Sequence, residues 1–221
     1  MIRLFCGYDP REAIGFHVFS QSVIKRASKP VSIVPLAAMG LPQGSNTFTL
    51  SRFLVPYLSG FKGHAIFADA CDMLMLGDVS ELDSLFDPSY AVQVVKHPGY
   101  MSQHARKYIG TEMECEQSNY DRKNWASLMI VNCEHSAWFA ATPKMMALAN
   151  PIELLQFQHF LGAEIGALSP EWNVLIDEGQ DDAGAKVLHW TAGIPTFKHY
   201  RNARRSKDWF AEHDELVVAH G

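Results

Sequence analysis

The sequence lacks paired cysteines, long apolar runs and an excess of basic charge, and each absence excludes a class of protein. Its four cysteines among 221 residues are irregularly spaced without a CxxC pair, which indicates reduced, buried thiols rather than a disulfide framework or a zinc site. No apolar run reaches the roughly 18 residues of a membrane-spanning helix. A net charge of −5 argues against wholesale binding of nucleic acid or anionic membranes. Together these absences predict a cytoplasmic protein without a transmembrane segment.

The composition that is present is that of an ordinary globular chain, with 48% hydrophobic and 19% charged residues. The length suits one core, and no linker, repeat or low-complexity tract divides it, so residues 1–221 are expected to form a single domain. The expected strands are 2–6, 31–36, 64–68, 90–96, 128–132 and 186–190, and the expected helices are 10–28, 50–58, 79–86, 136–149 and 154–165. This alternation predicts an α/β fold with a mixed, mostly parallel sheet flanked by helices.

The segment 64–74 runs as an apolar strand into two carboxylates, Asp69 and Asp72, before the chain becomes apolar again. Desolvated carboxylates require a cation or hydrogen-bond donors. Alternation along a strand cannot bring both side chains to one face, so a turn or bulge must follow the strand. At a strand end of an α/β sheet, the pair would suit a divalent metal and a phosphate. The alternative is a solvated strand end with a helix cap.

His189 ends another apolar run and precedes a turn that contains Gly193. An imidazole there could complete the two carboxylates as a ligand set that Mn²⁺ accepts, with nucleotide phosphates as further ligands. A core or capping histidine is the alternative. The loop 97–122 is long and polar enough for a lid over such a site. The basic run 198–207 is either a solvated face or a site for an anionic acceptor.

Six blocks of the sequence resemble, in order, the glycogenin-like and galactosyltransferase-like retaining glycosyltransferases. They are FCGYDPRE at 5–12, SRFLVPYL at 51–58, IFADACDML at 66–74, NWASLMIVN at 124–132, LSPEWN at 168–173 and HWTAG at 189–193. The resemblance covers most of the chain. It implies the GT-A fold with a Rossmann-like nucleotide-binding domain, and a nucleotide sugar, UDP-linked, used with Mn²⁺ or Mg²⁺.

By this resemblance, Asp72 is the second carboxylate of the family's Asp-x-Asp motif, and His189 is its later metal-binding histidine. Ala70 stands where the first Asp is expected. Asp69 would replace that carboxylate from one residue earlier if the strand end is bulged. The expected metal ligands are therefore Asp69, Asp72 and His189.

The resemblance also implies contacts with the nucleotide. Asp9 corresponds to the carboxylate beside the base, and Tyr8 offers an aromatic face for stacking. Helix capping is the other role open to Asp9. Arg52 lies where the family often places an arginine facing the nucleotide, and it could neutralise phosphate or hold the metal-site carboxylates. A surface ion pair is its alternative.

Two motifs of the family are altered in this chain. The helix motif Asp-Gln-Asp becomes Phe-Gln-His at 157–159, which leaves Gln158 to offer a carbonyl oxygen near the anomeric carbon. The phosphate motif His-x-x-Gly-x-x-Lys has no lysine at its end, although Lys198 follows at once. Stabilisation of the leaving group would then fall to Lys198, Lys123 or the metal.

The sequence therefore predicts a metal-dependent glycosyltransferase that moves a sugar, with retention, to an unknown hydroxyl on a glycan, lipid, protein or, with least support, nucleic acid. Asn124 and Ser127 would hydrogen-bond the donor sugar. A nucleotidyltransferase or nucleotide-sugar hydrolase is one alternative, but it would need a glycine-rich phosphate loop that residues 7–9 do not supply. The other alternative is a degenerate protein that binds nucleotide sugar without turnover, which the altered Asp-Gln-Asp motif permits.

Overall fold

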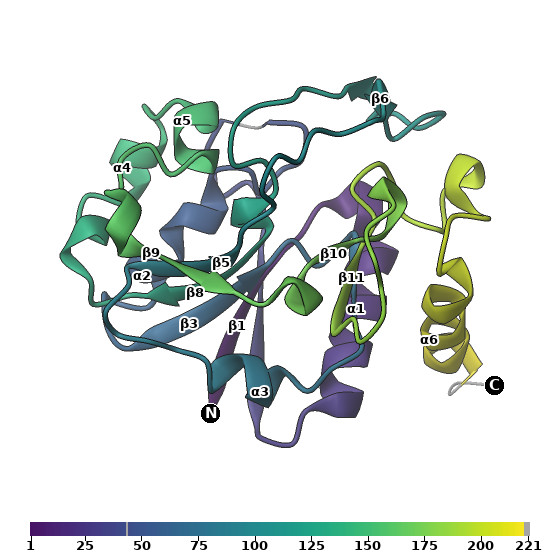
Figure 1. Cartoon of the computed structure of the whole chain (residues 1–221), viewed down its shortest axis with the longest axis horizontal. Coiled ribbons are helices and arrows are strands. Elements are labelled where there is room, and N and C mark those ends of the chain that lie inside the picture. The colour runs from purple at the N-terminus through teal and green to yellow at the C-terminus, as the bar shows by residue number, and fades with distance from the viewer. Residues whose placement is uncertain (43, 219–221) are drawn as a thin grey trace.

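The computed structural model describes residues 1–42 and 44–218, and its centre is a six-stranded sheet with helices on both faces (Figure 1). The strands are, in spatial order, β2 (Val31–Leu36), β1 (Ile2–Gly7), β3 (His64–Ala68), β8 (Leu128–Asn132), β5 (Val92–Val95) and β9 (Ile165–Leu168). β1 pairs in parallel with β2 and β3, and β5 pairs in parallel with β9. β8 runs antiparallel to both β3 and β5. The expected mixed, mostly parallel sheet is confirmed.

Two smaller sheets lie beside the central one. β4 (Met73–Met75) and β10 (Val174–Leu175) flank β11 (Val187–His189), which runs antiparallel to β4 and parallel to β10. β6 (Arg106–Lys107) and β7 (Cys115–Glu116) form a hairpin inside the long loop 97–122. The sequence did not predict β4, β10 or this hairpin, because strands of two or three residues carry too little periodicity.

The central strands are buried on both faces, which explains their uninterrupted apolar sequences. Ile66 of β3 packs in a core with Phe19 of α1 (Ala13–Arg26), whereas the next residue, Phe67, packs in a second core with Phe53. The first core also includes α3 (Val79–Asp83). The second is covered by the 3₁₀-helix η2 (Ser51–Leu54), α2 (Val55–Leu58), α4 (Pro143–Met146) and α5 (Pro151–Leu155).

The C-terminal helix α6 (Ser206–Val218) lies against α1 (Figure 1). Trp209 of α6 shares an apolar cluster with Val18 of α1, and Lys25 of α1 forms an ion pair of 2.6 Å with Glu215. The C-terminal helix therefore packs against the domain. In the described part of the chain, no helix is both long enough and apolar enough to cross a bilayer.

The expected helices 136–149 and 154–165 are wrong. In their place are the 3₁₀-helix η4 (Ser136–Trp138), α4, α5 and a further 3₁₀-helix, η5 (Gly162–Glu164), before the chain enters β9 at Ile165. Pro143 and Pro151 each begin a helix behind a capping side chain, because proline cannot lie inside one. Phe157, with a φ of 52°, prevents α5 from continuing.

Candidate active site

A tight turn at the end of β3 brings the two carboxylates together. Ala70 is left-handed, with a φ of 62°, and the Cys71 amide donates to the Asp69 carbonyl at 2.7 Å. The Asp69 amide donates to the Ser127 carbonyl of the neighbouring chain segment at 2.8 Å. This turn takes the place of the bulge that the Asp-x-x-Asp spacing requires, and β4 begins directly after Asp72.

Helix α1 and strand β11 fix the turn from two sides. A Cβ atom at Gly15 of α1 would lie 1.9 Å from the Cys71 carbonyl oxygen, so the helix can approach this closely only with glycine. On the other side, the Trp190 amide donates to the Asp72 carbonyl at 2.9 Å. Because Trp190 follows β11, this bond places His189 beside Asp72.

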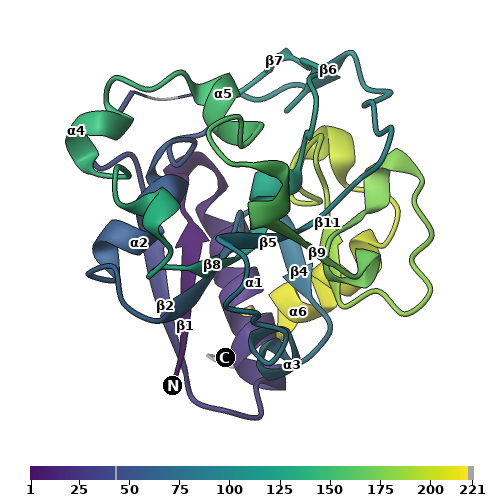
Figure 2. The same ribbon diagram turned by 60° about the vertical axis from the view of Figure 1, so that its left-hand side comes forward.

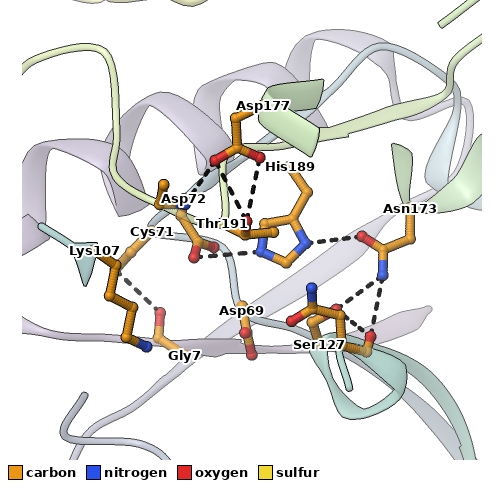
Figure 3. Close-up of polar contacts among 12 residues, drawn as sticks. Gly7, Asp69, Cys71, Asp72, Lys107, Ser127, Asn173, Asp177, His189 and Thr191 are labelled. Carbon is orange, nitrogen blue, oxygen red and sulfur yellow. Dashed lines mark hydrogen bonds and ion pairs between the residues drawn. The ribbon is translucent and has the colours of Figure 1, made fainter. Parts of the chain in front are cut away.

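Asp69, Asp72 and His189 form a buried cluster in which one ligand atom from each residue lies within 4.8 Å of the others (Figure 3). His189 Nε2 is 3.4 Å from Asp72 Oδ2. Among the described residues, the buried Asp72 Oδ1 has no hydrogen-bond partner, and Asp69 Oδ1 is contacted only by a charged arginine. Two carboxylates and an imidazole with uncompensated oxygens are a donor set that fits Mn²⁺ or Mg²⁺.

The electrostatics of the cluster point in the same direction. Burial and the neighbouring Asp72 raise the pKa of Asp69 to about 7, against the opposing charge of Arg52. Burial disfavours a charge on His189, but Asp72 and then Asp69 outweigh it and raise the pKa of the imidazole. A cation between these groups would stabilise both carboxylates in the charged form.

A buried asparagine sets the orientation of His189. Asn173 Nδ2 donates to Ser127 Oγ at 2.8 Å and to the Asn124 carbonyl at 3.3 Å, so its Oδ1 faces the imidazole (Figure 3). His189 Nδ1 donates to that oxygen at 2.9 Å. The free electron pair of the ring therefore lies on Nε2, which faces Asp72.

Arg52 compensates the other carboxylate. Its Nη1 lies 2.7 Å from Asp69 Oδ1 and donates to the Ala126 carbonyl at 2.9 Å. The guanidinium also lies over the rings of Phe48 and Phe67, at 5.2 and 5.3 Å from their centroids. Arg52 thus contacts the carboxylate of Asp69, and a surface ion pair is excluded because Arg52 is buried.

The cluster opens into a cleft that contains two further cations, Lys107 and Lys123. Lys123 Nζ donates to the Ser118 carbonyl at 2.6 Å, and burial together with Lys107 lowers its pKa to about 8. Lys107 Nζ donates to Ser45 Oγ at 2.9 Å. Lys123 was one of the three alternatives expected to stabilise the leaving group. No sequence motif indicated Lys107, which lies in the loop expected to form a lid.

The loop 97–122 is anchored to the rest of the domain at two points. The Tyr100 hydroxyl donates to Glu178 at 2.8 Å, and the Tyr108 amide donates to the Ala192 carbonyl at 2.7 Å. Both views show its hairpin beyond the carboxyl end of the central sheet (Figures 1 and 2). Residues of this loop therefore form one wall of the cleft, and no sequence motif had indicated Glu178 as their anchor.

The structure brings some of the expected site residues to the cleft and not others. Within the described chain, the cleft is lined by Arg52, Asp69, Asp72, Asn124, Ser127 and His189, but not by Tyr8, Asp9, Gln158 or Lys198. The Ser127 hydroxyl is available to a bound sugar only in part, because it donates to the backbone carbonyl of Asn124 at 2.7 Å and accepts from Asn173. The buried Asn124 Nδ2, in contrast, has no hydrogen-bond partner among the described residues.

Asp9 has the capping role. Its carboxylate accepts bonds from the Arg11 guanidinium at 2.8 and 2.6 Å, from the Arg11 amide at 3.0 Å and from the Thr47 amide at 3.0 Å. The carboxylate is fully buried and both oxygens are used. Tyr8 packs edge-on against Phe16, with 5.4 Å between ring centroids. The Asp9 carboxylate is therefore already fully engaged, whereas Tyr8 is half-buried and lies outside the cleft.

Gln158 and Lys198 are exposed and lie outside the cleft. The left-handed Phe157 buries its own ring in the core and turns Gln158 outward, where it contacts Gln156. Lys198 begins a 3₁₀-turn on the surface. The expected contacts of Gln158 with a sugar and of Lys198 with a phosphate are therefore not supported.

The basic run 198–207 is partly neutralised. Arg204 and Arg205 both form ion pairs with Asp182, and Arg205 also pairs with Asp208 at 2.7 Å. This pattern favours a solvated face over a site for an anionic acceptor.

Comparison with known proteins gives the family. No protein-family model matches the chain. Protein CDI of Arabidopsis thaliana is 34% identical over 229 residues, which cover 96% of this chain and 86% of that protein. The chain belongs to the family of protein CDI. The name of this relative does not state an activity.

Solved structures show which fold this member of the CDI family shares. The bifunctional glycosyltransferase WbbM superposes with a TM-score of 0.62 at 14% identity, over 96% of this chain and 51% of that one. The galactosyltransferase LgtC, solved with donor and acceptor sugar analogues, gives 0.60 at 10% identity, over 97% and 96% of the two chains. The chain thus spans about half of WbbM and nearly all of LgtC. It has the GT-A-like fold of these glycosyltransferases.

Proposed function

We propose that the protein is a metal-dependent glycosyltransferase that moves a sugar from a nucleotide sugar to a hydroxyl acceptor. The observation that carries the proposal is the buried cluster of Asp69, Asp72 and His189, with carboxylate oxygens that lack hydrogen-bond partners among residues 1–42 and 44–218. The cluster opens into a cleft rich in cations, in a fold that glycosyltransferases share.

The three residues of the cluster would hold Mn²⁺ or Mg²⁺. When bound, the ion would supply positive charge to the diphosphate of the donor. Asn173 keeps His189 Nε2 free to ligate, and the Arg52 guanidinium favours the charged form of Asp69 against the effect of burial. The chain itself thus prepares the ligand set before the donor arrives.

Lys107 and Lys123 support a diphosphate as the occupant of the cleft. As the bond between the sugar and the phosphate breaks, the leaving nucleoside diphosphate gains negative charge, and cations fixed in a partly buried cleft stabilise it. Lys123 is held by the Ser118 carbonyl, so its ammonium does not have to be reoriented. We assign it the role that Lys198 cannot fill from its exposed position.

The nucleotide, the stereochemistry, the acceptor and the compartment belong to the proposal as well. The six sequence blocks favour a UDP-linked donor and retention of configuration. The acceptor is a hydroxyl of a glycan, lipid, protein or nucleic acid, and the neutralised basic run disfavours the last. The four cysteines are unpaired, which fits a reducing compartment such as the cytoplasm.

Thermal unfolding with nucleotide sugars tests the proposal. A donor at 100 times its dissociation constant stabilises the native state by about 2.7 kcal/mol. We expect a UDP-sugar to raise the midpoint only when Mn²⁺ or Mg²⁺ is present, and the hit then to be turned over in the presence of an acceptor hydroxyl. Asp72→Asn and His189→Ala should remove the metal-dependent shift.

The matched control is Asp214→Asn, which removes an exposed carboxylate of α6. This variant should keep the full metal-dependent shift. If no nucleotide sugar stabilises the wild type, or if Asp72→Asn behaves like Asp214→Asn, the proposal is wrong. Binding without transfer or hydrolysis would instead identify a nucleotide-sugar-binding protein, and release of free sugar independent of any acceptor would identify a hydrolase.

A further inference from the structure

An apolar cavity lies next to the cleft, on the other side of η2 and α5. Its walls include Phe53, Trp138, Met145, Met146, Leu148 and Leu154. The one titratable side chain in the wall is His159, and burial lowers the pKa of its imidazole, so it is neutral at physiological pH. Among the described residues, no charged side chain lines this cavity.

The cavity and the cleft share their walls. In η2, Arg52 faces the cleft and Phe53 the cavity; in α5, Leu155 faces the cleft and Leu154 the cavity. Both views place α5 between α4 and the β6–β7 hairpin (Figures 1 and 2). The two hollows are therefore neighbours separated by one layer of backbone.

The segment 148–152 forms a rim between the two hollows, and its residues are apolar except for the exposed Asn150. Leu148 and Ala149 line the cavity, and Pro151 and Ile152, two residues further along, line the cleft. Leu148 is 77% exposed and Ile152 is 42% exposed. Five of the twelve large apolar side chains that are exposed in the described chain fall between residues 139 and 161. Three of these five belong to the two hollows, since Met145 and Leu148 line the cavity and Ile152 lines the cleft.

We infer that the cavity receives the hydrocarbon chain of a lipid acceptor, whose hydroxyl enters the cleft across the rim from Leu148 to Ile152. The inference rests on the proposed function and names its acceptor class. An extended peptide segment would bring backbone amides and carbonyls into a wall that offers them almost no polar partner, whereas a hydrocarbon chain needs none. Because the rim leads from the cavity into the cleft, the hydrocarbon chain in the cavity would belong to the same molecule as the hydroxyl that reacts in the cleft.

Alkyl glucosides with methyl, hexyl, octyl and decyl chains serve as probes, each below its critical micelle concentration. Calorimetric titration should show about a threefold to fourfold gain in affinity for each added methylene until the cavity is full. Leu148→Glu and Met145→Glu, at exposed positions, should weaken binding of the decyl glucoside at least about tenfold. The control Ile24→Glu alters a side chain of α1 that is 60% exposed and should bind like the wild type.

A second measurement locates the chain. An alkyl glucoside brominated on its chain should quench the fluorescence of Trp138, and Trp138→Phe should remove that part of the quenching. An affinity independent of chain length, or equal in Leu148→Glu and Ile24→Glu, overturns the inference. So does self-association that Leu148→Glu abolishes without any chain binding, because a second copy would then be the occupant.

The outcomes separate this inference from the proposed function. Metal-dependent binding of a nucleotide sugar, measured on the same variants, should be unchanged by Leu148→Glu. Donor binding without chain-length dependence refutes the lipid acceptor alone. Chain binding in a wild type that binds no nucleotide sugar refutes the proposed function and, with it, the assignment of the chain to an acceptor.

Discussion

Replacing Asn173 with leucine should weaken metal binding without touching a ligand. Asn173 is fully buried, and its amide joins His189, Ser127 and the Asn124 carbonyl. Leucine has a similar size but would leave His189 Nδ1 and Ser127 Oγ short of a partner, which should cost roughly 1–3 kcal/mol of stability for each group. Without Asn173 to orient His189, the site should bind Mn²⁺ about 10- to 100-fold more weakly, which is a loss of about 1.4–2.7 kcal/mol of binding free energy.

Calorimetric titration of Mn²⁺ in the absence of nucleotide measures this effect directly. Asn173→Asp keeps an acceptor for His189 Nδ1 and should bind Mn²⁺ more tightly than Asn173→Leu. Asn202→Leu, at an exposed asparagine in a surface turn, is the control for the substitution itself. The reasoning is refuted if Asn173→Leu is folded, as judged by its cooperative unfolding, and still binds Mn²⁺ with the affinity of the wild type.

Two further predictions concern the cleft and the turn. Lys123 is charged below its pKa of about 8, so the affinity for UDP in the presence of Mn²⁺ should fall as the pH rises through that value. Lys123→Arg should flatten this pH profile, because a guanidinium stays charged. Identical pH profiles for the wild type and Lys123→Arg would contradict the role of Lys123. Gly15→Ala should lower the free energy of unfolding by about 1–3 kcal/mol, because its Cβ would meet the Cys71 carbonyl at 1.9 Å. The matched control Gly162→Ala has open space around it, and equal denaturation midpoints for the two variants would disprove the contact.

The parts of the fold that the sequence predicted are those where burial alone determines the pattern. The strands 64–68 and 128–132 were predicted with the bounds that the structure shows, since both are buried on two faces and read as unbroken apolar runs. The predicted helix 154–165 failed at Phe157, because a single left-handed residue leaves hydrophobic periodicity unchanged. The expected place of Gln158 depended on that helix and failed with it.

The candidate site was predictable where its residues end strands, and not where distant segments meet. Asp72 follows an apolar run and His189 ends one, so the sequence indicates both positions. No sequence pattern predicted the role of Asn173, because that role depends on contacts with residues 46 and 16 positions away in the chain. Lys107 lies in a polar loop, where lysine is the expected surface residue.

The turn from Asp69 to Asp72 combines unfavourable features that the rest of the structure must compensate. A left-handed alanine costs about 1–2 kcal/mol, and two buried carboxylates repel each other. Backbone contacts stabilise the strained turn, namely the hydrogen bonds with Ser127 and Trp190 and the close approach of Gly15. None of these contacts needs an ion. The repulsion is only partly relieved by Arg52. Removal of metal should therefore leave the turn folded and its charges uncompensated, which is the condition of a site prepared for a cation.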